Sequence, residues 1–94
     1  MSFVKLKYKN EFYTKDSEIL KILKNEEFYW LIDSEVSNAN IEIINNTIIW
    51  NSGDYLFGDW YYGIFKSGKF FGNWKNGIFE GGTFKGNWES GIKK

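Results

Sequence analysis

Apolar and polar residues alternate in the first part of the chain with a period of two, which is typical of a β-strand with one solvated face. Residues 4–8 follow this pattern, with lysines between their apolar residues. Residues 9–11 have the composition of a turn, and residues 12–14 fit a returning strand. The pattern therefore predicts a hairpin in this part of the chain.

Residues 17–24 fit two structures. Ile19, Ile22 and Leu23 would form a helical stripe with an N-cap at the first residue of the segment, whereas Leu20 and Ile22 fit the alternation of a strand. The segment is short for a helix, and turn-forming residues flank it on both sides. A strand is the favoured prediction.

Three further runs are rich in β-branched or aromatic residues and predict strands at 28–32, 41–44 and 47–50. The pair of asparagines at 45–46 tolerates the left-handed backbone of a tight turn, and 38–40 has similar turn chemistry. Short strands separated by turns predict an all-β protein.

Glycine and aromatic residues set the pattern of the second part of the chain. All ten glycines lie between Gly53 and Gly91, and an aromatic residue follows most of them two places later. The motif recurs every 14 residues, so that Trp60, Trp74 and Trp88 occupy one position of successive units. A fixed period is typical of a repeat architecture, in which each unit buries its apolar face against its neighbours.

The chain is therefore predicted to have two parts within one compact domain. Residues 1–52 would form an N-terminal β-meander that caps one end, and residues 53–94 would form the repeat region. Fourteen residues suit one antiparallel hairpin with two tight turns. Because residues two apart in a strand share a face, Phe70 and Trp74 would contribute to one aromatic face, opposite a polar one.

The segments 70–77 and 84–91 share a Gly-x-Trp-x-x-Gly core that resembles MORN repeats. The resemblance covers about residues 53–92, although the unit of 14 residues is shorter than the family repeat. Similar short glycine–aromatic repeats also occur in phage proteins of unknown role. The resemblance implies an array of β-hairpins used mainly in protein–protein contact and dimerisation, with lipid binding proposed for some members. It carries over no site residues.

A β-helix, or solenoid, is the alternative fold. The spacing of five residues between aromatics is similar to that of pentapeptide β-helices. The spacing falls to four at Phe70–Trp74 and at Phe84–Trp88, which would break a square coil. The hairpin array is preferred for this reason.

The composition removes several classes of function. The 94 residues contain twelve lysines and twelve carboxylates, and they include no arginine, histidine, cysteine or proline. The sequence therefore predicts no metal site, no cofactor and no nucleophile of the Cys–His or Ser–His type. Zero net charge and the missing arginine argue against nucleic acid. No apolar run is long enough to span a membrane and no signal-peptide core is present, so we expect a cytoplasmic location.

Carboxylates are the remaining candidates for acid–base chemistry. Asp54 and Asp59 occupy equivalent positions in the repeat and would lie on adjacent strands, as the two carboxyl groups of a glycosidase must. The preferred interpretation places both on the solvated face opposite the rings. We therefore expect a protein that is not an enzyme.

Four aromatic residues fall outside the register of the repeat, where packing in the core does not account for them. Exposed aromatic rings are common anchors of protein–protein interfaces. The predicted partner-binding residues are Phe57, Tyr61, Tyr62 and Phe71.

The function predicted from the sequence is non-enzymatic binding of another protein. The chain would act as an adaptor, or as a small inhibitor of the kind that phages and mobile elements encode to mask a host protein. The main alternative is a structural component that self-assembles in a larger particle. A homodimer could form through the glycine-rich last strand or the aromatic face. Binding of carbohydrate, lipid or nucleic acid through exposed aromatics is a further alternative.

Overall fold

The computed structural model describes residues 2–94 and begins with a hairpin. Strand β1 (Phe3–Tyr8) pairs with β2 (Glu11–Tyr13) in antiparallel register. Lys9 and Asn10 form the turn with positive φ angles of 50° and 65°. The hairpin predicted from the alternation of residues is confirmed.

Two helices follow where the sequence analysis predicted strands at 17–24 and 28–32. Helix α1 spans Asp16–Asn25 and helix α2 spans Tyr29–Ile32. Ile19 and Leu23 lie one helical turn apart and are both fully buried, so the helical stripe decides the first segment. The strand prediction for 28–32 is wrong because burial of Phe28 and Leu31, three residues apart, overrides the β-propensity of the run.

The long hairpin at the centre of the molecule contains the strands predicted at 41–44 and 47–50. Strand β3 (Glu35–Ile44) pairs antiparallel with β4 (Thr47–Phe57) and parallel with β1. The turn at Asn45–Asn46 is confirmed, with φ angles of 49° and 59°. Residues 38–40 lie within β3, where the register shifts, and do not form the predicted turn.

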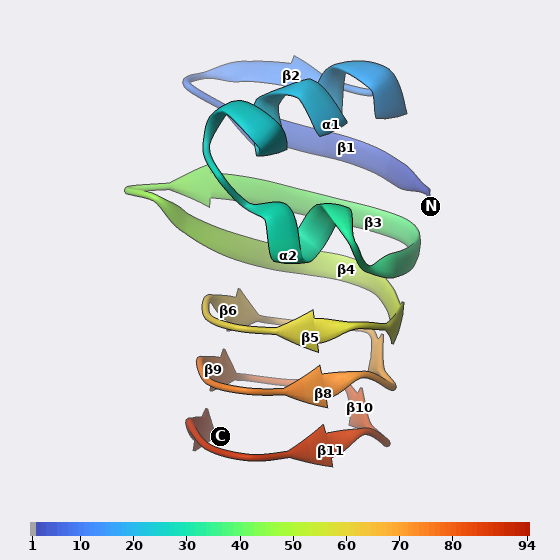
Figure 1. The fold of residues 1–94 in the computed structure, drawn as a ribbon, viewed down its shortest axis with the longest axis vertical. Coiled ribbons are helices and arrows are strands. Elements are labelled where there is room, and N and C mark those ends of the chain that lie inside the picture. The colour runs from blue at the N-terminus through green and yellow to red at the C-terminus, as the bar shows by residue number, and fades with distance from the viewer. Residues whose placement is uncertain (1) are drawn as a thin grey trace.

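The repeat region forms a coil of two-residue strands that runs down the lower half of Figure 1. Its strands are β5 (Asp59–Trp60), β6 (Ile64–Phe65), β7 (Lys69–Phe70), β8 (Asn73–Trp74), β9 (Ile78–Phe79), β10 (Thr83–Phe84), β11 (Asn87–Trp88) and β12 (Ile92–Lys93). Strands 14 residues apart pair in parallel, and so Trp60 lies beside Trp74 and Phe65 beside Phe79. The protein is mostly β, and its repeat is arranged as a solenoid.

Parallel pairing corrects the prediction of antiparallel hairpins. One turn of the coil passes from Trp60 to Phe65, Phe70 and Trp74, with spacings of five, five and four residues. These three spacings close a coil with three sides. A four-residue spacing would break a square coil. Here it completes each three-sided turn, so that the next unit lies directly beneath the one before it.

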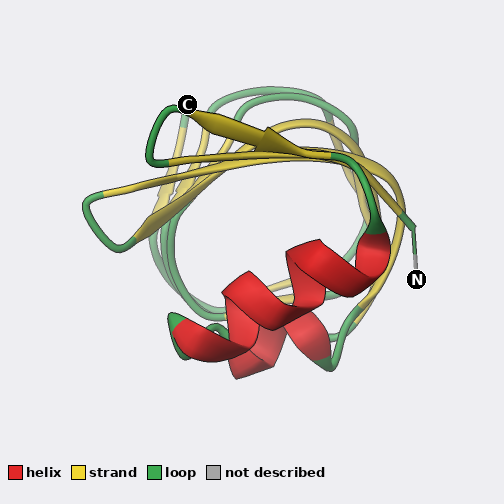
Figure 2. Cartoon of the chain, turned by 90° about the horizontal axis from the view of Figure 1, so that it is seen from above, coloured by secondary structure: helices red, strands yellow, loops and turns green. Residues whose placement is uncertain are grey.

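Aromatic rings fill the inside of the coil in vertical columns. Trp60, Trp74 and Trp88 stack with centroid distances of 5.2 and 5.3 Å, and Phe70 stacks on Phe84 at 5.3 Å. Rings of neighbouring columns meet edge to face, a favourable arrangement for aromatic quadrupoles. Figure 2 looks down this coil. Most rings of the repeat therefore form the core.

Glycines form the three corners of the coil, and at each corner the glycines of successive turns stack. A Cβ atom on the later glycine would press against the carbonyl oxygen of the one before it, which keeps the coils close enough to share backbone hydrogen bonds. The three columns are Gly53, Gly68 and Gly82; Gly58, Gly72 and Gly86; and Gly63, Gly77 and Gly91.

Residues of the N-terminal part continue the same core above the coil. Strand β4 is shared, because Trp50 pairs with Phe65 on one side of the coil and Tyr55 pairs with Phe70 on the next. The third side is closed by α1 and α2, which lie above β5, β8 and β11 (Figures 1 and 2). Neither helix in residues 2–94 is long and apolar enough to cross a membrane.

Candidate functional site

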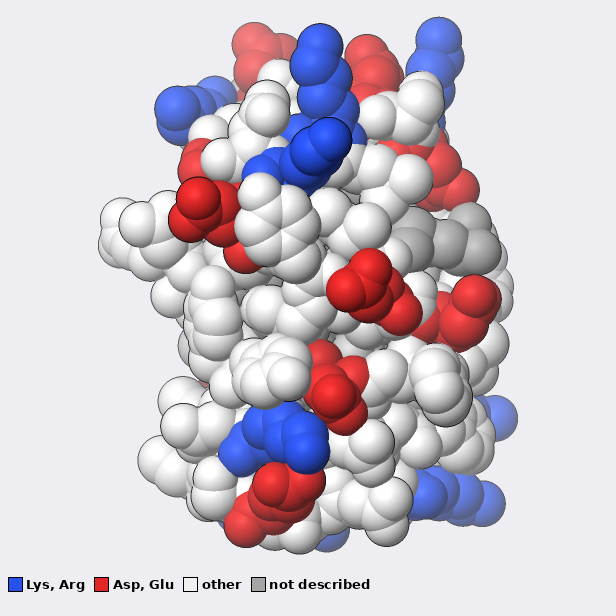
Figure 3. Space-filling view, in the orientation of Figure 1, with Lys and Arg blue, Asp and Glu red and all other residues white. Residues whose placement is uncertain are grey.

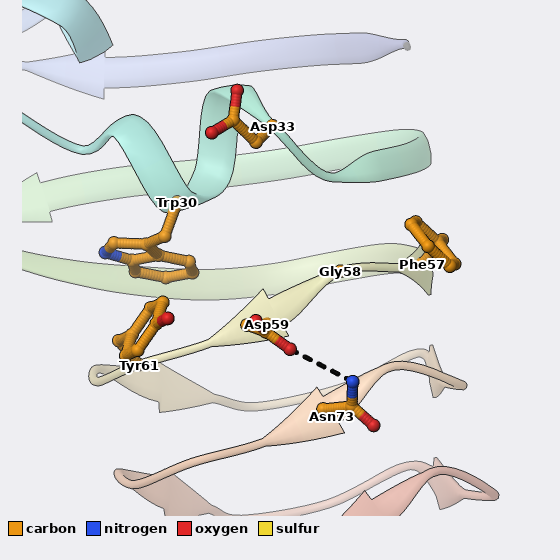
Figure 4. A pocket seen from close by; sticks show the side chains of 7 residues that line it. All are labelled: Trp30, Asp33, Phe57, Gly58, Asp59, Tyr61 and Asn73. Carbon is orange, nitrogen blue, oxygen red and sulfur yellow. Dashed lines mark hydrogen bonds between the residues drawn. The ribbon is translucent and has the colours of Figure 1, made fainter.

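An open groove lies between α2 and the first turn of the coil, on the face shown in Figure 3, where carboxylates gather beside uncharged side chains. Its volume is about 370 Å³. In Figure 4, Trp30 and Tyr61 lie at one end and Phe57 at the other, with the carboxylate of Asp33 above. The groove is lined by Trp30, Asp33, Phe57, Gly58, Asp59, Tyr61 and Asn73.

The upper wall of the groove is fixed by Ser34, a buried polar residue two positions after the end of α2. The Ser34 hydroxyl donates a hydrogen bond of 2.7 Å to the carbonyl of Trp30 and is also hydrogen-bonded to the Tyr55 hydroxyl. Gly58 packs directly against Ser34, where a Cβ would not fit. These contacts hold Trp30 and Asp33 above β5.

Tyr55 should make the stability of this wall depend on pH. Burial, as the main cause, raises the pKa of Tyr55 far above its ordinary value. The unfolded chain releases the Tyr55 proton near pH 10 while the folded chain keeps it. The contribution of Tyr55 to the stability of the folded chain is therefore complete below pH 10 and is lost as pH rises. In urea titrations between pH 8 and 11.5, the free energy of unfolding should fall with rising pH in the parent chain. Above pH 10 it should fall less steeply in Tyr55→Phe, by up to about 1.4 kcal/mol per pH unit.

The same variant loses the hydrogen bond to Ser34, so at pH 8 it should be less stable than the parent chain by about 1 kcal/mol. Tyr13→Phe, a change on β2 away from Ser34, serves as the matched control. Equal slopes for the parent chain and Tyr55→Phe above pH 10 would show that Tyr55 does not carry the effect.

Phe57 owes its position to one extra residue in the first turn of the coil. Tyr55 and Trp60 are five residues apart, whereas the equivalent rings Phe70 and Trp74 are four apart. The longer corner leaves the side chain of Phe57 69% exposed, the highest value among the large hydrophobic residues described as exposed. The regular coil does not need this residue, since the later turns close without it.

The structure exposes all four aromatic residues singled out in the sequence but brings two of them to the groove. Phe57 and Tyr61 line it. Tyr62 is 41% exposed and packs its ring against Phe28 and Trp30, at 5.9 and 5.7 Å. Phe71 follows β7 outside the groove. Tyr55 pairs with Phe70, so Phe71 lies on the outer side of these strands, near the end of β4.

Trp30 and Asp33 belong to the groove and were not among the predicted site residues. The strand prediction for 28–32 hid them, because a strand would place Trp30 on one face with Phe28. In the helix, Phe28 and Leu31 face the core and Trp30 is half-buried at the edge of the groove. The three-residue spacing of Phe28 and Leu31 is the signal that could have found them.

Asp54 and Asp59 do not form the carboxylate pair considered for catalysis. Their strands are not paired with each other, because β4 pairs with β6 and β7 whereas β5 pairs with β8. Asp54 accepts a hydrogen bond from the backbone N–H of Lys69, and Asp59 accepts one of 3.0 Å from the side-chain amide of Asn73. They belong to different sides of the coil.

Polar side chains on the groove side of the coil form a ladder below Asp59. The amide of Asn87 donates to Asn73 at 2.9 Å, and that of Asn73 donates to Asp59. One column further along, Lys75 forms an ion pair of 2.5 Å with Glu89. Among residues 2–94, no group of three or more histidine, cysteine or acidic side chains could hold a metal ion.

No protein-family model, no curated protein and no solved structure matches the chain.

Proposed function

We propose that this chain is a non-enzymatic binding protein that uses the groove between α2 and the first coil to contact another protein. The exposure of Phe57 carries the proposal. Its ring stands on a corner that is one residue longer than the later corners, while the regular aromatic columns are buried. An exposed aromatic ring beside a groove is the kind of anchor on which interface energies depend.

The surroundings of Phe57 support this function. Tyr61 is 48% exposed on the same groove, and Leu56, 44% exposed, precedes Phe57 in β4. Phe57 is the last residue of β4 and Tyr61 directly follows β5, so paired strands position both rings. The resemblance of the Gly-x-Trp-x-x-Gly motifs to MORN repeats, which serve mainly in protein–protein contact, points in the same direction.

A capture experiment tests the proposal. The tagged chain and a Phe57→Ser/Tyr61→Ser variant are used as baits in a lysate of the host cell, and the captured proteins are identified by mass spectrometry. Loss of two aromatic anchors should weaken binding of the true partner by about 100-fold or more, because single anchors contribute at least about 2 kcal/mol. The parent chain should therefore retain a stoichiometric protein that the variant loses.

Phe12→Ser is the matched control. Phe12 is 57% exposed on β2, outside the groove, and its loss should leave capture unchanged. Circular dichroism shows whether each variant is folded. A partner retained equally by the folded groove variant would refute the proposal.

Two further measurements define the partner. A mass of twice 11.1 kDa in light scattering of the purified chain would identify the partner as a second copy. If a captured protein loses its own activity when the chain is bound, the chain acts as an inhibitor of the kind that a phage or mobile element would encode. If the captured protein keeps its activity, the chain acts as an adaptor.

A further inference from the structure

The groove carries two negative charges and no positive one. Asp59 contributes one carboxylate from β5, and Asp33 contributes the other from the end of α2, where it points up and away from Asp59 (Figure 4). The other lining residues are uncharged. The chain as a whole has no net charge, so this is a local excess.

The charge of Asp59 is not required by the ladder below it. Asp59 accepts a hydrogen bond from the amide of Asn73, just as Asn73 accepts one from Asn87. An asparagine at position 59 would accept the same bond through its side-chain oxygen. The equivalent positions in the next two turns are Asn73 and Asn87, so of these three positions the first alone carries a charge.

The charge of Asp33 is likewise not explained by the fold. Asp33 is exposed and is the C-cap of α2, a helix of one turn. Within residues 2–94, its carboxylate has no hydrogen bond or ion pair. Its negative charge therefore gains nothing from the helix that carries it.

Lys75, a basic side chain that interacts electrostatically with Asp59, has another partner. Lys75 forms an ion pair with Glu89, and this hydrogen bond is the main cause of the raised pKa of Lys75, to which Asp59 contributes less. Lys75 does not line the groove. The two carboxylates thus remain available to a cation from outside.

Aromatic rings complete the surroundings of that cation. Trp30 and Tyr61 meet edge to face at 6.4 Å, and Phe57 lies at the opposite end of the groove. Faces of tryptophan and tyrosine attract lysine and arginine side chains, and carboxylates bind the same groups through charge-assisted hydrogen bonds. A phosphate or an acidic segment would be repelled by both aspartates.

We propose that the groove binds a lysine or arginine side chain of a basic segment in the partner protein. Asp59 holds the charged group from β5, Asp33 adds negative charge above it at the end of α2, and Trp30 and Tyr61 cover its aliphatic part. This inference rests on the proposed function and specifies the chemistry of the partner.

The test uses an acetylated and amidated hexa-arginine peptide as the probe and the ¹⁵N-labelled full chain. In ¹H–¹⁵N spectra at about 0.15 M salt, where distant charges are screened, the probe should shift the indole N–H of Trp30 and the backbone N–H groups of Gly58 and Tyr61. In the Asp33→Asn/Asp59→Asn variant, the dissociation constant should rise about tenfold or more. Both asparagines keep the size and the acceptor oxygen of the residues that they replace.

Asp54→Asn is the matched control, because it removes one carboxylate from another side of the coil. It should leave the affinity for the probe within about twofold, since a screened distant charge contributes little. Asp59→Asn alone removes the same charge as Asp54→Asn, so the affinities of these two single variants for the probe can be compared directly.

Absence of shifts at the groove with 1 mM probe would overturn the inference, and so would equal affinity of the parent chain and the double aspartate variant. The captured partner separates this result from the proposed function. A partner lost with Phe57→Ser/Tyr61→Ser but retained with Asp33→Asn/Asp59→Asn would leave the proposed function standing and refute the cationic ligand.

Discussion

Replacing Gly68 by alanine is expected to destabilise the repeat region strongly. Gly68 has a φ of +120°, a backbone conformation that alanine rarely adopts, and its Cβ would overlap the carbonyl oxygen of Gly53 in the turn above. Both obstacles are backbone and cannot move without separating two turns of the coil. The overlap and the strained φ together should lower the free energy of unfolding by at least about 3 kcal/mol, a large part of the total for a domain of this size.

Thermal unfolding monitored by circular dichroism measures this effect. Gly68→Ala should lower Tm by more than about 12 °C, because each kcal/mol corresponds to about 4–8 °C for a domain of this length. Gly81→Ala is the graded control. Its φ lies outside the left-handed region and its Cβ would lie 2.9 Å from the carbonyl oxygen of Lys66, a lesser conflict. Equal losses in the two variants would contradict the proposed packing of the corners.

Trp60→Ala should have the second large effect. Trp60 is fully buried and its ring meets six other aromatic rings, which belong to α2, to β4 and to the coil below. Truncation removes a ring shared by the N-terminal part and the repeat. The expected loss is about 3–5 kcal/mol, the usual range for a buried tryptophan.

Chemical denaturation of Trp60→Ala, Trp60→Phe and Trp88→Ala measures this loss. Phenylalanine keeps an aromatic ring, and the buried indole N–H of Trp60 has no hydrogen-bond partner among the described residues, so Trp60→Phe should lose about half as much. Trp88 is only partly buried in the last described turn, and its truncation should be milder. A similar loss for Trp60→Ala and Trp88→Ala would show that Trp60 does not join the two parts.

The repeat could be found from the sequence, but the pairing of its strands could not. The 14-residue period and the aromatic positions follow from the residues, because Trp60 and Trp74 are equivalent by inspection. A two-residue strand flanked by glycine, however, fits a hairpin and a coil equally well. The choice depends on the positive φ angles at corners such as Gly68 and Gly77, and these are consequences of stacking between turns.

The helices and the site show the same limit. Residues 28–32 have strong β-propensity, yet Phe28 and Leu31 form a helical turn because together they cover the open side of the core. The exposure of Phe57 and Tyr61 could be predicted from their place outside the repeat register. Their position in one groove with Asp33 depends on where α2 packs, and the local sequence pattern does not contain that tertiary information.

The parallel stacking described above makes the length of this molecule independent of its recognition surface. Each turn contacts mainly the turn before and the turn after it, and each adds about 4.8 Å along the axis. The groove uses α2, the first turn and Asn73, but nothing beyond Asn73. Duplication of one 14-residue unit below it would preserve every contact that shapes the groove, including the hydrogen bond that Asn73 accepts from the turn beneath it. Evolution, or an engineer, can thus change the reach of the scaffold in whole modules while its binding specificity stays constant.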